Sequence, residues 1–221
     1  FGMHGLDETR INDILARGYD YRLGMGPLPT QYDDLSAGDR LRIGDRTFEI
    51  MIGQGHSPHL AMLHDATNGL ILCSDQVLGR ISPNVGVLSG DPQGDPLGRY
   101  LASNRDLGTA LDPDILVLPG HDIPFRGIHR RIEELARHHE LRCLAIERAC
   151  IDRLMTATEL IPHVFGRSFR DNQLGYALTE TLAHVNLLVN EGRLIRDTRP
   201  AGFAFRAADR PPMSGNLPVA T

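Results

Sequence analysis

The chain has 221 residues, a hydrophobic content of 41% and a formal net charge of −5. This composition suits one large folded domain, or one domain with a small appendage, and excludes a chain that is mostly disordered. No apolar run approaches the roughly 20 residues that cross a bilayer, and the first residues lack the basic and apolar series of a signal peptide. We therefore expect a cytoplasmic protein without a membrane partner.

Cysteine usage and charge distribution argue against two further classes of site. The chain has three cysteines, an odd number, and no Cys-x-x-Cys pair: Cys73, Cys143 and Cys150. This favours reduced thiols over a disulfide framework or a thiolate zinc site. Residues 1–125 carry 9 Arg against 17 Asp and Glu, whereas residues 126–206 carry 13 against 10. The C-terminal part is therefore only mildly basic, which makes nucleic acid an unlikely partner.

The first part of the chain has the pattern of a β-rich domain. After a short helix that begins at Asp7 and ends at Gly18, and a loop at 25–29, hydrophobic runs separated by turn residues predict strands. The expected elements are strands 40–43, 47–52, 60–63 and 70–73, a loop at 79–96, a helix at 96–111 and a strand at 115–118.

The pattern changes to helical beyond residue 127. An amphipathic helix begins at Ile128, Thr156 to Glu159 form a capping box for the next helix, and a third helix carries the apolar stripe from Leu174 to Val189. Two β-like pieces follow, at 193–196 and 202–206. Three helices and a two-stranded ribbon are the outline of a winged helix. We expect a β-rich domain at 1–126, a winged-helix-like segment at 127–206 and a flexible tail at 207–221.

Three short fragments stand where predicted strands end. They are Gly55-His56-Ser57-Pro58-His59, Ser74-Asp75 and Leu118-Pro119-Gly120-His121. Rigid strand ends hold imidazoles and carboxylates in fixed positions, as a hydrolytic metal centre requires. Each residue alone is more often a surface, capping or turn residue than a ligand. The three together predict one site at the edge of a sheet.

The order and spacing of these fragments resemble the metallo-β-lactamase superfamily, within it the metal-dependent hydrolases with a C-terminal winged-helix segment. Residues 81–85 and 138–142 strengthen the likeness. The resemblance implies an α/β (α+β) fold, in which residues 1–126 are the C-terminal portion of a four-layer αββα sandwich. It also implies two divalent metal ions, zinc first and iron or manganese as alternatives. His56 would bind one ion and His121 the other. Asp75 would bind both ions and would be the catalytic residue, and His59 would support the ligands from a neighbouring position.

The resemblance implies hydrolysis, in which a hydroxide that bridges the metals attacks a carbonyl or phosphoryl centre. Our first hypothesis is a hydrolase that acts on an ester, thioester or lactone. The family's other ligands come from a run of the form His-x-His-x-Asp-His, which occurs nowhere in the 221 residues. We therefore expect a fragment of an enzyme, nearly inactive by itself, with a small-molecule substrate and a possible homodimer.

Two other functions remain open at this point. One is a nucleic-acid-processing, endoribonuclease-like hydrolase of the same superfamily, and the other is a degenerate scaffold without catalysis. The remaining histidines of the helical part are expected to be structural. We place His138 and His139 at surface and interhelical positions, because neighbouring helix positions point in different directions, and His184 in the packing of the last helix.

Overall fold

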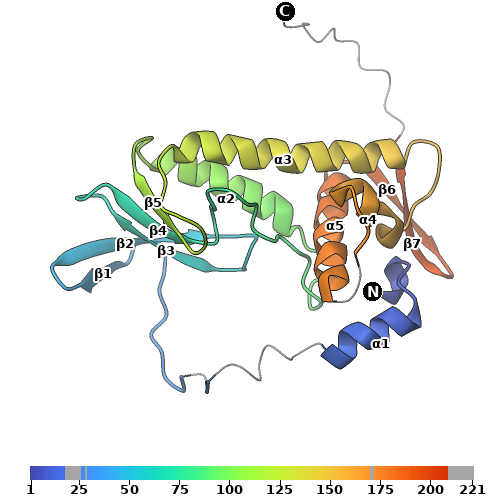
Figure 1. Ribbon diagram of the computed structural model, residues 1–221, viewed down its shortest axis with the longest axis horizontal. Coiled ribbons are helices and arrows are strands. Elements are labelled where there is room, and N and C mark those ends of the chain that lie inside the picture. Colours follow the sequence, from blue (N-terminus) through green and yellow to red (C-terminus); the bar gives the residue numbers. More distant parts are fainter. Residues whose placement is uncertain (18–25, 28, 170–171, 209–221) are drawn as a thin grey trace, which may run out of the picture.

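The computed structural model describes residues 1–17, 26–27, 29–169 and 172–208. A β-sheet with two covering helices occupies one end of the molecule, and a helical part with a β-hairpin occupies the other (Figure 1). The predicted end of the first helix at Gly18 and most of the predicted tail lie outside the described residues.

The sheet has five strands in the order β1-β2-β3-β4-β5. The first four strands pair antiparallel, and β5 pairs with β4 in parallel. The strands form where the alternating and apolar runs predict them. Their bounds are Arg40–Ile43 for β1, Arg46–Gly53 for β2, Leu60–Asp65 for β3, Leu70–Ser74 for β4 and Leu116–Pro119 for β5.

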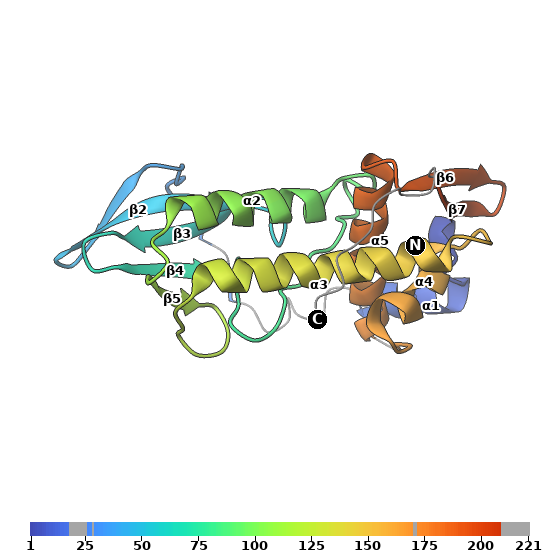
Figure 2. The ribbon, with the colours of Figure 1, turned by 90° about the horizontal axis from the view of Figure 1, so that it is seen from above.

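Helices α2 (Pro96–Ala110) and α3 (Ile128–Ala149) cover one face of this sheet (Figures 1 and 2). Met62, Ile71 and Val117 are fully buried against them. The opposite face is also apolar: its register brings together Leu63, Leu70, Leu72, Leu116 and Leu118. A sheet with two apolar faces is typical of one that is buried between two layers. This α/β arrangement fits the predicted sandwich.

The helical part contains α4 (Ala157–Phe165), α5 (Asn172–Asn190) and a hairpin of β6 (Leu194–Arg199) with β7 (Gly202–Ala207). The predicted capping box is present, since the Thr156 side chain accepts from the Glu159 backbone N–H and the Glu159 carboxylate accepts from the Thr156 N–H. Together with α3, these elements have the expected outline of three helices and a ribbon, and β6 extends beyond its predicted end.

Two hydrophobic cores hold the molecule together, and α2 and α3 contribute to both. Leu107 and Leu135 pack under the sheet, whereas Leu97 and Ile146 pack with α4 and α5. The N-terminal segment, a short 3₁₀ turn followed by α1 (Glu8–Arg17), also joins the second core. The boundary near residue 126 therefore stays a prediction, since residues before and after it share a core.

The environment of the thiols agrees with the sequence interpretation. Cys73, Cys143 and Cys150 are buried and free, and burial raises the pKa of the Cys73 and Cys150 thiols to about 11. Among the described helices, none combines the length and apolar character needed to cross a membrane. The cytoplasmic location stays a prediction.

The histidines of the helical part lie where the sequence analysis expected structural residues. His138 is half-buried, whereas His139 is fully buried and takes the interhelical position expected for one of this pair. His139 Nδ1 lies 3.1 Å from His184 Nε2, and His184 Nδ1 donates to the Glu180 carbonyl at 2.8 Å. His139 therefore faces α5 and donates its Nδ1–H to His184. Sequence spacing could not show this because the two residues are 45 positions apart.

This buried pair predicts a loss of stability in mild acid. Burial lowers the pKa of His139 to about 2 and that of His184 to about 3, from an ordinary 6.5. Since both pKa values are lower in the folded state, the unfolded chain binds more protons below pH 6.5. The free energy of unfolding therefore has its full value above pH 6.5. Below that pH it decreases by up to about 1.4 kcal/mol per pH unit for each histidine.

The measurement is urea unfolding between pH 7.5 and 5. A His184→Gln variant should lose part of the slope of unfolding free energy against pH, since one titrating group is gone. Equal slopes for the variant and the parent protein would contradict this assignment.

Candidate metal centre

The three predicted site residues meet at the ends of β2, β4 and β5. His56 lies in the turn after β2, Asp75 directly follows β4, and His121 lies two residues after β5. His56 Nε2 and His121 Nε2 are each 3.5 Å from the same oxygen, Asp75 Oδ2. The structure therefore brings the three side chains together at one edge of the sheet.

The orientation of His56 is set by a backbone carbonyl. Its Nδ1 lies 2.8 Å from the carbonyl oxygen of Asn84, which can only accept, so Nδ1 must carry the proton. In the neutral ring, Nε2 then presents a lone pair to the Asp75 carboxylate, which is also an acceptor. Two acceptors that face each other need a positive species between them, either a proton or a metal ion. A ring N–H donated to a carbonyl is also the usual support of a metal-binding histidine.

The backbone around Asp75 is held in an uncommon conformation. Ser74 has φ 46°, a left-handed value that costs a residue other than glycine roughly 1–2 kcal/mol. Gly120 leaves the room for the carboxylate, because a Cβ there would lie 2.3 Å from Asp75 Oδ1. The pairing of β4 with β5 is irregular between Leu72 and Ser74. Local strain of this kind is typical of functional sites.

The turn that carries His56 is packed against α2 and against a buried glutamine that the sequence interpretation missed. Gln76 is fully buried and donates from Nε2 to the Gln54 carbonyl at 3.3 Å and to Asn104 Oδ1 at 2.8 Å. Gly55 has φ 102°, and a Cβ there would lie 2.3 Å from the Tyr100 Cβ. The turn has little freedom to move. No motif marks Gln76 beyond its place directly after Asp75.

The donor set suits metal ions of the zinc type, which take imidazole and carboxylate ligands. Two ligands on a tetrahedral ion, each bonded at about 2.1 Å, lie about 3.4 Å apart. Each histidine is close to that distance from Asp75. However, in the described part of the chain no group of three or more His, Cys, Asp or Glu side chains could hold an ion. The described residues supply two pairs of ligands, His56 with Asp75 and His121 with Asp75. They do not supply the complete set of ligands for either ion.

The exposed fractions of the site residues differ. The side chains of His56 and Asp75 are 29% and 23% exposed, whereas that of His121 is 66% exposed. His59 lies on the exposed side of the turn, so its supporting role stays a prediction. Asn84 was part of the fragment that carried the family resemblance, but its support of His56 was not foreseen.

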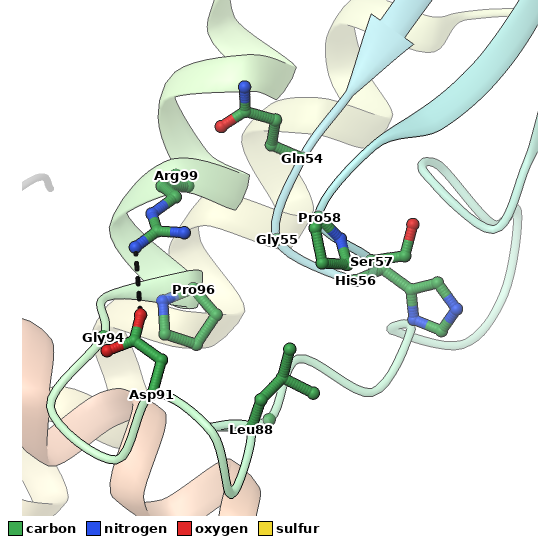
Figure 3. A pocket seen from close by; sticks show the side chains of 11 residues that line it. Gln54, Gly55, His56, Ser57, Pro58, Leu88, Asp91, Gly94, Pro96 and Arg99 are labelled. Atoms are coloured by element: carbon green, nitrogen blue, oxygen red, sulfur yellow. Dashed lines mark ion pairs between the residues drawn. The ribbon is translucent and has the colours of Figure 1, made fainter. Parts of the chain in front are cut away.

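A pocket opens beside His56 (Figure 3). The turn after β2, the loop before α2 and the first turn of α2 form its walls. Pro58, Leu88 and Pro96 supply apolar surface, and Asp91 pairs with Arg99 at 3.5 Å. In the view of Figure 3, His56 lies at one end of the pocket and this ion pair at the other. An apolar pocket with a few polar groups beside candidate ligands is the usual form of a small-molecule site.

Comparisons with known proteins agree with the family resemblance seen in the sequence. Residues 143–207 match the family described as metallo-β-lactamase-like, C-terminal domain. The chain is 38% identical to a β-lactamase domain protein from Burkholderia ambifaria, with a TM-score of 0.78, covering 82% of this chain and 54% of the other. It is 27% identical to a metallo-β-lactamase family protein from Thermus thermophilus, with a TM-score of 0.70, covering 90% and 64%.

A curated relative is also similar. A probable metallo-hydrolase of Bacillus subtilis strain 168 is 29% identical over 141 residues, which are 62% of this chain and 43% of the relative. The chain thus spans between about two fifths and two thirds of the length of these three proteins. The fold and these matches together support a place for the chain in the metallo-β-lactamase superfamily.

Proposed function

We propose that this chain contributes one half of the active centre of a metal-dependent hydrolase that cleaves an ester, a thioester or a lactone. The observation that supports this most directly is the Asp75 carboxylate, whose one oxygen lies 3.5 Å from both His56 Nε2 and His121 Nε2. A carboxylate shared by two imidazoles is the arrangement expected of a ligand that bridges two ions. The other donors would come from residues other than those described.

The roles of the three residues follow from their positions. His56 and Asp75 would hold one ion, and His121 and Asp75 the other. When bound, two such ions lower the pKa of a water molecule and supply positive charge for the oxyanion of an acyl-transfer reaction. Asp75 would also accept a hydrogen bond from that water. The Asn84 carbonyl keeps the His56 ring in the tautomer that leaves Nε2 free to bind.

The neighbouring pocket favours a small acyl compound as substrate. It is an open pocket whose lining includes the apolar side chains of Pro58, Leu88 and Pro96. Leu88 is 58% exposed and offers apolar surface to an acyl chain. A substrate bound along this pocket would place its carbonyl beside His56.

The charge of the helical part gives little support to the nucleic-acid alternative. Several arginines there are paired with glutamates: Arg142 with Glu180, and Arg193 with Glu140, Glu147 and Glu191. Paired guanidinium groups are less available to a phosphate backbone. Zinc is our first choice of metal, with iron or manganese as alternatives, and a homodimer remains a prediction.

Removing the metal tests this proposal. The whole protein, dialysed against a strong chelator, should lose hydrolysis of ester, thioester and lactone substrates and regain it when zinc, manganese or iron(II) is added. Mass spectrometry of the native protein should find about two ions per chain. Hydrolysis that survives complete metal removal would reject the proposal, and a protein that neither binds metal nor hydrolyses any substrate would favour the degenerate scaffold.

A further inference from the structure

The loop between β4 and α2 connects the candidate centre to helix α5, which lies in the other core. Val85 and Val87 are buried in that core, and the Val87 N–H donates to the Thr179 carbonyl at 3.1 Å. Gly86 lies so close to α5 that a Cβ would be 2.8 Å from Thr179 Oγ1. The middle of the loop is thus fixed to α5.

Asn84 has contacts in both directions. Its backbone carbonyl accepts from His56 Nδ1 at 2.8 Å, and its side-chain Nδ2 donates to Glu180 Oε2 at 2.9 Å. Glu180 belongs to α5, and its side chain is only 9% exposed. A carboxylate accepts a stronger hydrogen bond than a neutral group does. Because the carbonyl and the side-chain amide belong to one residue, a fixed side chain limits the movement of the peptide whose carbonyl accepts the hydrogen bond from His56.

Glu180 is itself held in place. Arg142 of α3 forms a close hydrogen-bonded ion pair with Glu180 Oε1, and the Arg142 guanidinium lies 4.7 Å from the centre of the Phe165 ring of α4. Burial raises the pKa of the Glu180 carboxyl, while Arg142 and Asn84 oppose that rise. Three helices thus fix the carboxylate that Asn84 binds.

We propose that Glu180, acting through Asn84, is a positioning residue for His56, so that the helical part sets the geometry of the metal centre. The proposal about Glu180 depends on the proposed function in one respect only, the role of His56 as a metal ligand. The competing explanation is that Glu180 merely neutralises Arg142 and holds α3 against α5. In that case its loss would lower stability without a specific effect on His56.

The experiment compares four variants of the whole protein. Glu180→Leu removes the acceptor for Asn84 at similar volume, Glu180→Gln keeps an acceptor, and Asn84→Ala removes the donor. The matched control is Arg193→Gln, which breaks the ion pair with Glu147 at 2.6 Å and weakens the packing of α3 without touching Asn84. Zinc affinity is measured by competition with a chromophoric chelator. In the metal-free protein, nitrogen-15 NMR follows the His56 ring N–H.

We expect Glu180→Leu and Asn84→Ala to weaken zinc binding by about tenfold, the lower end of the effect of a lost support of a metal ligand. Both should broaden or shift the His56 ring N–H signal. Glu180→Gln should have a smaller effect, and Arg193→Gln should lower the thermal midpoint but leave zinc affinity and the ring signal unchanged.

Unchanged affinity and ring signal in Asn84→Ala would overturn the proposal, and so would an equal loss in Arg193→Gln. If Glu180→Leu does not fold, Asn84→Ala decides. If the parent protein binds none of zinc, manganese and iron(II), the proposed function fails, but the ring signal of the metal-free protein still shows whether Glu180 positions His56.

Discussion

Replacing Asp75 by alanine in the whole protein is expected to abolish hydrolysis, with a loss of turnover on the order of a thousandfold or more. One oxygen of this carboxylate lies 3.5 Å from both imidazoles, so a single substitution removes a ligand from both ions. The measurement is turnover of a generic ester or thioester, together with the metal content of the purified variant.

Two further variants separate a loss of catalysis from a loss of folding. Asp75→Asn has nearly the same volume as the parent residue and should fit over Gly120, so it should fold normally and still lose turnover. Asp45→Asn, in the exposed turn between β1 and β2, is the matched control and should keep full activity. Unaltered turnover in Asp75→Ala would show that the chemistry lies elsewhere. Full turnover by the 221 residues alone, with zinc or manganese added, would contradict the expectation that their site is incomplete.

The part of the site that could be predicted from the sequence rests on local signals. Apolar runs that end in His56, Asp75 and His121 place those residues at strand ends, and parallel pairing of β4 with β5 then brings the last two to one edge. The capping box at Thr156 was visible for the same reason, because its partners are three residues apart.

The part that could not be predicted depends on long-range contacts. Asn84 and Glu180 are 96 residues apart, and Gln76 reaches Asn104 across 28. No local pattern encodes such pairs, since they exist only after the helices have packed. The left-handed backbone of Ser74 was also hidden, because serine has no strong preference for it.

The burial of His139 shows a limit of periodicity as a guide. His138 and His139 are adjacent on α3, and their positions alone cannot show which of them faces a neighbouring helix. The structure places the His139 ring 5.6 Å from that of Tyr100 on α2 and 5.2 Å from that of His184 on α5. The contact that distinguishes the two histidines is therefore made by helices that come earlier and later in the chain.

A buried charge on α5 should destabilise the fold more than any other substitution considered above. Leu182 is 4% exposed and packs in the core that α2, α3, α4 and α5 share. Leu182→Asp would place an unpaired carboxylate there, and we expect it to lower the free energy of unfolding by several kcal/mol. Leu182→Ala should cost about 2–5 kcal/mol through the cavity alone.

The matched control for Leu182→Asp is Tyr176→Asp on the same helix, where the side chain is 65% exposed and the cost should stay within roughly 0.5 kcal/mol. Thermal and urea unfolding of the metal-free protein give the comparison, because bound metal would add its own stabilisation. An unchanged thermal midpoint for Leu182→Asp would mean that α5 is not packed as the structure shows. In that case Glu180, two residues earlier on the same helix, could not hold Asn84 against His56, and the role of α5 in the metal centre would also be wrong.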